Sequence, residues 1–144
     1  MKKLFFTIVS IIGLVSFAYA DNDRPITPDQ LPDISTQIIK KHFPSSAIER
    51  AYIDDDVMDK DYTVYLAGGV KIEFNSKGEW KEIETRTSVP ATLVPTAITQ
   101  YVKKNYPSCK IEKISRDRRG MDIELSNGLD IEFDKSYRVV EIDD

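Results

Sequence analysis

The strongest constraint on the fold of this 144-residue chain is that its two halves repeat each other. Residues 62–75 and 121–134 align without a gap, and each stretch carries Ile-Glu-Phe shortly after a glycine. Upstream, residues 40–44 (KKHFP) correspond to residues 103–107 (KKNYP). A duplication of this kind indicates two copies of one supersecondary unit, so both halves should contain the same helix and the same strands.

The correspondence is offset by 63 residues up to the first strand of each copy and by 59 residues beyond it. The extra residues of the first copy fall in the acidic stretch 54–61, which we predict to be a connecting loop because loop-closure entropy rises slowly with length. Carboxylate oxygens are also the ligands that calcium prefers. The stretch lacks the glycine and the spacing of an EF-hand loop, so a solvated hairpin loop is favoured over a cation site.

The first 20 residues have the pattern of a secretory signal peptide. Lys2 and Lys3 precede an apolar run over residues 4–17, and the small-x-small sequence Ala18-Tyr19-Ala20 follows. We expect cleavage after Ala20, a periplasmic or secreted mature protein and no membrane insertion after cleavage.

Removal of the two lysines leaves 18 basic and 24 acidic residues, a net charge of −6. This balance argues against nucleic acid as a partner, because nucleic-acid binders carry a basic patch. The single Cys109 has no partner for an internal disulfide and is interpreted as a small apolar residue. Each unit of about 60 residues would be marginally stable alone, so one domain built from both units is expected.

We expect a tail over residues 21–25, a first unit over 26–86 and a second over 87–144. Each unit should open with a helix. Thr27-Pro28-Asp29-Gln30 is a capping-box pattern, and a further proline at 32 predicts a short turn before the main helix. Apolar residues at helical spacing follow in both units: Leu31, Ile34, Ile38 and Ile39 in the first, and Val94, Ala97, Ile98, Tyr101 and Val102 in the second.

Four strands should follow each helix. First strands are expected at 48–54 and 111–116, and fourth strands at 79–85 and 138–142. The pairs Gly68-Gly69 and Asn127-Gly128 are typical of two-residue hairpin turns joining the second and third strands. The sequence therefore predicts an α+β fold: a tandem repeat of two helix-plus-four-strand units forming one antiparallel sheet, with the helices on one face.

These motifs resemble those of a known family. The helix ending in His-Phe-Pro or Asn-Tyr-Pro, the hairpin Gly-Val-Lys-Ile-Glu-Phe-Asn and the Lys-Gly-Glu-Trp after it are similar to PepSY-like, β-lactamase-inhibitor-like secreted proteins of Bacteroidetes. Residues 21–26 are similar to the start of such proteins. The resemblance implies a tandem fold like that of the β-lactamase inhibitory protein, whose concave sheet grips an enzyme.

The face of the sheet away from the helices is the candidate binding surface. Strand alternation places Val64, Ile72, Phe74 and Ile83 under the helices. It then predicts that five residues lie on the open face, namely Tyr52, Tyr65, Lys71, Glu73 and Trp80. Aromatic residues among charges are typical of protein-binding hot spots, although a Trp80–Tyr65 pair that only stabilises the sheet is the alternative. The second unit offers a more acidic set, Lys113, Asp122, Glu124, Asp130 and Glu132.

Catalytic and metal-binding patterns are weak. Glu73 and Glu132 occupy equivalent positions on the polar side of their strands, where solvated charges normally lie, rather than facing each other across a pocket. His42 is the only histidine, which disfavours a zinc site, and no nucleophile motif accompanies it. We therefore expect no catalytic residues, no metal site and no cofactor.

The sequence thus favours an exported, non-enzymatic module that docks a protein or peptide of the cell envelope on its open sheet face, with inhibition of an extracytoplasmic enzyme as one form of that role. The alternative is a periplasmic protein that binds a small ligand or a metal such as calcium. A hydrolase is the least favoured class.

Overall fold

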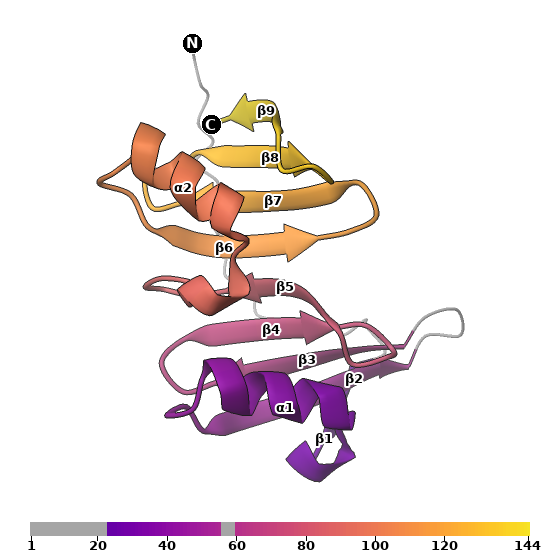
Figure 1. Ribbon diagram of the computed structural model, residues 1–144. Helices are drawn as coiled ribbons and strands as arrows, with labels where there is room; N and C mark the ends of the chain where they lie inside the picture. Colours follow the sequence, from indigo (N-terminus) through magenta and orange to yellow (C-terminus); the bar gives the residue numbers. More distant parts are fainter. Residues whose placement is uncertain (1–22, 56–59) are drawn as a thin grey trace, which may run out of the picture.

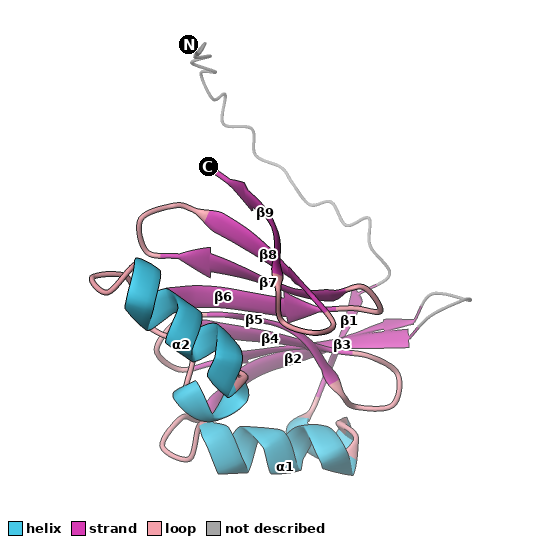
Figure 2. Cartoon of the chain, turned by 45° about the horizontal axis from the view of Figure 1, so that its top comes forward, coloured by secondary structure: helices cyan, strands magenta, loops and turns pink. Residues whose placement is uncertain are grey.

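The computed structural model describes residues 23–55 and 60–144. The predicted signal peptide and the central part of the acidic loop lie outside these residues. Within them the chain forms one nine-stranded antiparallel sheet in which each strand pairs with the next along the chain, from β1 to β9. Two α-helices pack on one face of this sheet (Figures 1 and 2). The predicted α+β class, with one antiparallel sheet and helices on one face, is confirmed.

After β1, the described residues of the two halves contain the same order of elements: a 3-10 turn, a helix and four strands. The strands are β1 (Asp23–Ile26), β2 (Ile48–Asp55), β3 (Lys60–Leu66), β4 (Val70–Phe74), β5 (Trp80–Glu84), β6 (Ile111–Arg116), β7 (Gly120–Leu125), β8 (Asp130–Asp134) and β9 (Val139–Asp143). The helices are the 3-10 turn η1 (Pro28–Gln30) and α1 (Asp33–His42) in the N-terminal half, and η2 (Ala91–Leu93) and α2 (Thr96–Asn105) in the C-terminal half.

The start of the first helix follows the predicted capping pattern. The backbone N–H of Thr27 donates to Oε1 of Gln30 at 2.9 Å, which holds the turn η1. The chain then passes through Pro32 into α1, as expected for a proline tolerated only in a first turn. Lys40 and Lys41 lie in the last turn, where positive charge suits the helix dipole.

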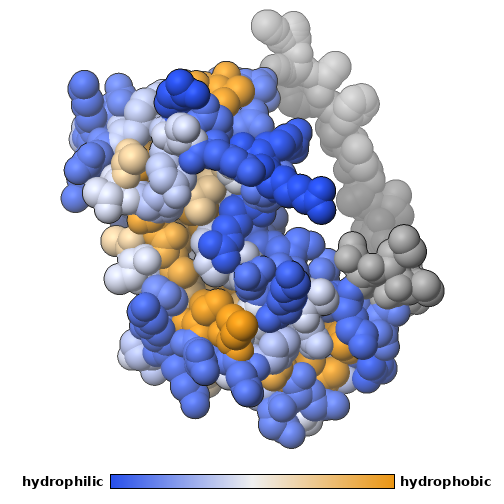
Figure 3. Space-filling model, turned by 45° about the vertical axis from the view of Figure 1, so that its right-hand side comes forward, coloured by the Kyte–Doolittle hydropathy of each residue, from blue (hydrophilic) through white to orange (hydrophobic). Residues whose placement is uncertain are grey.

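The core lies between the helices and the covered face of the sheet. The predicted inward residues Val64, Ile72, Phe74 and Ile83 are all fully buried there. The C-terminal half contributes Ile123, Ile131 and Phe133, the equivalents of Val64, Ile72 and Phe74, together with Ile114 of β6. The helices contribute Ile39, Ile98 and Val102. The outer surface seen in Figure 3 is mostly hydrophilic, with small apolar areas between the charged groups.

The predicted tail over residues 21–25 is wrong in part, and within the described residues the sheet has nine strands where eight were expected. Residues 23–26 form β1, which pairs with β2 so that Arg24 lies opposite Ile53. Arg24 also forms an ion pair with Asp55 at 3.2 Å. A four-residue strand that contains Pro25 has too little alternation to be predicted locally, and only the pairing partner creates it.

Both hairpin glycines adopt the left-handed conformation that the sequence predicts, with φ of 83° at Gly69 and 91° at Gly128. The two-residue turns predicted for both hairpins are wrong. In the first hairpin three residues lie between the paired Leu66 and Val70, and the second hairpin also has a longer loop. The N–H of Gly128 donates to the carbonyl of Leu125, whose own N–H donates to the carbonyl of Leu129, both at 2.9 Å. This pattern is that of a three-residue loop, in which only the last residue needs a positive φ, so Asn127 keeps an ordinary one.

Candidate functional site

The open face of the sheet is crossed by two rows of side chains, each contributed by eight neighbouring strands. The register aligns the first row as Arg50, Tyr65, Lys71, Glu84, Lys113, Glu124, Asp130 and Asp143. It aligns the second as Tyr52, Thr63, Glu73, Glu82, Ser115, Asp122, Glu132 and Glu141. Both rows begin with an aromatic or basic residue on β2 and end with carboxylates on β7 to β9.

At the β2 end of the rows lies a cluster that we call the tyrosine patch, formed by Arg50, Tyr52, Tyr65, Lys71 and Glu73. The rings of Tyr52 and Tyr65 meet edge to face with their centroids 6.1 Å apart. The guanidinium carbon of Arg50 lies 4.4 Å from the centroid of the Tyr65 ring, within the range of a cation–π contact. These residues line a hollow of about 380 Å³.

Lys71 and Glu73 are fixed as a pair in this patch. The Nζ of Lys71 lies 3.3 Å from Oε2 of Glu73. Partial burial is the largest influence and lowers the pKa of Lys71, but the carboxylate of Glu73, together with Tyr65 and Glu84, outweighs it, and the pKa is raised. The lysine therefore stays charged at neutral pH. Four of the five predicted surface residues, Tyr52, Tyr65, Lys71 and Glu73, thus lie together on the open face, half-buried between neighbouring strands.

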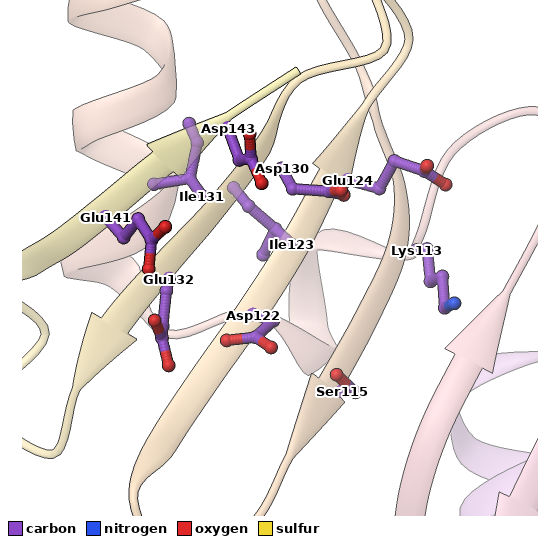
Figure 4. A pocket seen from close by; sticks show the side chains of 10 residues that line it. All are labelled: Lys113, Ser115, Asp122, Ile123, Glu124, Asp130, Ile131, Glu132, Glu141 and Asp143. Atoms are coloured by element: carbon purple, nitrogen blue, oxygen red, sulfur yellow. The ribbon is translucent and has the colours of Figure 1, made fainter.

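At the other end of the rows lies a cluster that we call the acidic patch, which consists of Asp122, Glu124, Asp130, Glu132, Glu141 and Asp143 (Figure 4). It surrounds a hollow of about 310 Å³, and among the described residues that line this hollow Lys113 is the only cation. The pKa of Asp122 is raised, first by partial burial and then by the negative charges of Glu132 and Asp117. Within the described part of the chain, no group of histidine, cysteine or acidic residues has an arrangement suited to a metal ion.

The predicted placement of Trp80 on the open face is wrong. Its side chain is 5% exposed and belongs to the hydrophobic core. Trp80 lies opposite Phe74, whereas Glu73 lies opposite Glu82, so Lys81 is an extra residue that interrupts the pairing of β4 and β5. This β-bulge shifts the alternation by one residue and turns the indole under the helices.

Arg116 completes the surroundings of Trp80. Its guanidinium carbon lies 3.9 Å from the indole centroid. Its Nε–H donates to the carbonyl oxygen of Trp80 at 2.8 Å. Burial lowers the pKa of Arg116. This contact and the one between Arg50 and Tyr65 were not predicted, because neighbouring strands bring each pair together and neither pair is close in sequence.

The remaining sequence candidates lie elsewhere. Glu73 on β4 and Glu132 on β8 share a row but are separated by three strands, so they do not face each other. The Nδ1 of His42 lies 2.7 Å from Oγ1 of Thr92, which joins the end of α1 to η2. Burial, then the charge of Lys41, lowers the pKa of His42. The predicted loop over the acidic stretch 54–61 is wrong at both ends, because residues 54–55 belong to β2 and residues 60–61 to β3, where they pair with each other. Residues 56–59 lie outside the described residues, so for them the loop stays a prediction.

Comparison with known proteins agrees with this architecture. A periplasmic protein of the DUF2874 family from Bacteroides vulgatus, described as putative, is 42% identical, with a TM-score of 0.82 over 88% of this chain and 100% of its own. A second structure, from Bacteroides thetaiotaomicron, is described as a "putative calcium-regulated periplasmic protein". It is 39% identical, with a TM-score of 0.84 over 88% of this chain and 100% of that one.

A third structure, a "putative periplasmic protein of unknown function" from Bacteroides vulgatus, is 38% identical, with a TM-score of 0.80 over 85% of this chain and 99% of its own. No curated protein matches the chain. Among the described residues, no helix is long and apolar enough to span a membrane. The predicted location outside the cytoplasm agrees with the periplasmic description of all three relatives, and the protein is periplasmic or secreted.

The family model described as "Putative beta-lactamase-inhibitor-like, PepSY-like" matches residues 60–141, which run from β3 through most of β9. The resemblance inferred from the helix ends and hairpin motifs is confirmed. The chain belongs to this PepSY-like family.

Proposed function

We propose that this protein is an exported, non-enzymatic binding module that docks a protein or peptide on the open face of its sheet, with the tyrosine patch as the anchor. The observation that carries this proposal is the edge-to-face pair of Tyr52 and Tyr65, with Arg50 against Tyr65, on a face that the helices leave uncovered. Tyrosine and arginine are enriched among the residues that dominate protein interfaces, and tyrosine buries much area at little entropic cost.

The family description, inhibitor-like, supports a partner that is itself an extracytoplasmic enzyme. We further propose that the two halves are copies of one unit. Interruptions of strand pairing at matching positions support this, between Ile48 and Arg50 and between Ile111 and Lys113. A duplicated unit gives one long sheet, and therefore one long binding face, from a short chain.

The test is capture from cell-envelope extract on immobilised protein, quantified by mass spectrometry. We expect the wild-type chain to retain a partner. The amount of partner captured by Tyr52→Ala/Tyr65→Ala should be lower by roughly tenfold or more, since truncation of an anchor typically costs about 2 kcal/mol or more of binding free energy. The matched control is Ile34→Ala, an exposed apolar residue on α1 away from the open face. Circular dichroism checks the fold, and equal capture by the folded double variant would disprove the anchor.

Calcium binding is the second candidate. It is favoured by the relative described as calcium-regulated. Carboxylates outnumber cations in the acidic patch, but among the described residues they do not have an arrangement suited to a metal ion. A ligand that binds only the folded state raises the melting temperature. Millimolar calcium should therefore raise that temperature for a calcium-binding protein, and magnesium at equal ionic strength should not. No shift with calcium would leave the docking function as the better account.

A further inference from the structure

The two edges of the sheet differ in how they are protected. β1 forms one edge and carries Pro25 and Arg24, residue types that discourage further strand pairing. β9 forms the other edge, and every one of its residues is exposed. Val140 is 60% exposed and Ile142 is 43% exposed, both unusually high for apolar strand residues. In the described part of the chain, no strand pairs with the outer side of β9.

β9 is the equivalent of β5, which does have a neighbour on its outer side. Both strands carry the same bulge, because Phe74 lies opposite Trp80 and Phe133 opposite Val139. Ile83 on β5 is fully buried, whereas its equivalent Ile142 is 43% exposed. The strand that accounts for the difference is β6, whose Ile114 lies opposite Ile83. The apolar side chain of Ile142 on β9 therefore lies where β5 packs against β6, but no strand of the described residues covers it.

The pairing of β5 with β6 also defines the backbone geometry of such a strand. The N–H of Thr85 donates to the carbonyl of Glu112 at 2.8 Å. Hydrogen-bonded pairs alternate along antiparallel strands, so Ile83 and Ile114 form the next hydrogen-bonded pair. By equivalence, the N–H and carbonyl of Ile142 point away from β8 and are available to an added strand.

The charges beside β9 specify the chemistry of that strand. On β6, Lys113 lies opposite Glu84, and its Nζ is 3.6 Å from Oε2 of Glu82. The equivalent acids on β9 are Asp143 and Glu141, which face Asp130 and Glu132 of β8. Like charges directly opposite each other destabilise a sheet. A cation on the outer side would relieve this repulsion, as Lys113 does for β5.

We propose that the outer edge of β9 binds an extended cationic peptide segment as a tenth, antiparallel strand. An apolar residue of the peptide lies opposite Ile142 on the covered side of the sheet. Lysine or arginine residues on either side of it face Asp143 and Glu141 on the open side. Main-chain hydrogen bonds supply affinity in this mode, and alternate side chains supply specificity. The site is separate from the tyrosine patch, so either proposal can fail without the other.

The test uses the exported chain and a short fluorescent peptide in which lysine alternates with isoleucine. Two matched peptides accompany it: one with glutamate in place of lysine, and one with N-methylated isoleucine amides, which keeps the charge but removes the donors. We expect fluorescence anisotropy to show binding of the lysine peptide and binding weaker by about tenfold or more for both controls, each tenfold corresponding to about 1.4 kcal/mol.

Three variants of the chain test whether the peptide binds at the outer edge of β9. Glu141→Lys/Asp143→Lys should weaken binding about tenfold, because the charges then repel. Ile142→Pro should abolish it by removing the outward donor, and an edge strand tolerates proline. Tyr52→Ala/Tyr65→Ala, at the far end of the rows, should bind within about twofold of wild type.

Equal binding of the lysine and N-methylated peptides would overturn the proposal by showing charge attraction alone. Unchanged binding by the charge-reversed variant, which keeps the backbone of the strand, would overturn it equally. Sedimentation tests the remaining alternative, in which the edge of β9 pairs with a second copy of the chain. If the chain forms a dimer that Ile142→Pro dissociates and the peptide does not, the edge binds a second copy and the proposal is wrong.

Discussion

After β1 the two halves of the molecule share an order of elements. They differ at the turn between β4 and β5 and at its equivalent between β8 and β9. In the N-terminal half the turn contains Gly78, whose carbonyl accepts a 2.9 Å hydrogen bond from the buried hydroxyl of Ser35 on α1. In the C-terminal half the equivalent residues are Tyr137 and Ile98. Tyr137 also has a positive φ, of 62°, but is 42% exposed, and Ile98 is fully buried.

This difference shows that the turn geometry is retained while the contact that it makes is not. A Cβ at Gly78 would lie 2.7 Å from Cβ of Pro32, so only glycine fits against α1. Tyr137 also has the left-handed conformation, which is strained for a residue with a Cβ, but its side chain is 42% exposed and so has room that Gly78 lacks. The two halves therefore carry different residues at one backbone position, according to the space beside it.

The largest difference in stability between equivalent positions of the two halves should be found at Trp80 and Val139. Trp80→Ala removes a buried indole and should lower the free energy of unfolding by about 3–5 kcal/mol. Val139→Ala, at the equivalent but 37% exposed position, should cost less than about 1 kcal/mol. Urea denaturation of both variants measures the difference. Similar losses would contradict the bulge that places Trp80 in the core.

The next largest difference in stability should be found at the turns that contain Gly78 and Tyr137. Gly78→Ala forces a Cβ into Pro32 and strains the backbone, so we expect a loss of about 2–3 kcal/mol. Tyr137→Ala should change stability by less than about 1 kcal/mol, because the position is already occupied by a residue with a Cβ. Thermal denaturation of the two variants compares them, and equal losses would show that the helix contact is unimportant.

A smaller effect is expected at the hairpin glycine of the C-terminal half. A Cβ at Gly128 would contact nothing within 4 Å, so the cost of Gly128→Val comes from the φ of 91° alone. We expect a loss of about 1 kcal/mol. Gly128→Asn is the control, since asparagine tolerates this conformation better than valine does. A valine variant as stable as the asparagine variant would rule out backbone strain at this turn.

The smallest effect should come from His42, whose equivalent in the C-terminal half is Asn105. The pKa of His42 is lowered below its ordinary value of 6.5 in the folded chain. The unfolded chain therefore binds the proton first, and the stability contribution is full above pH 6.5 and declines as the pH falls through that value. His42→Asn should remove this dependence. Chemical denaturation of both proteins between neutral and mildly acidic pH measures it, and parallel pH profiles would disprove it.

The sequence by itself determined the class of the fold and most of its elements. The duplicated pattern placed the helices, the hairpin glycines and the buried rows such as Ile72 and Phe74, because periodicity and turn chemistry are local properties of a chain. It also identified Tyr52, Tyr65, Lys71 and Glu73 as residues of the open face. The excess of acidic residues on the open face of the C-terminal half was also evident from the sequence, because aspartate and glutamate occupy alternate positions of its strands.

Only the tertiary structure decided the position of Trp80, the existence of β1 and the exposure of β9. A β-bulge depends on how two strands pair and not on either strand alone, so the extra residue at Lys81 could not be inferred from alternation. β1 exists because β2 offers an edge, and β9 is exposed because no described strand lies beyond it. These features arise from contacts between distant segments, for which a single sequence carries no periodic signal.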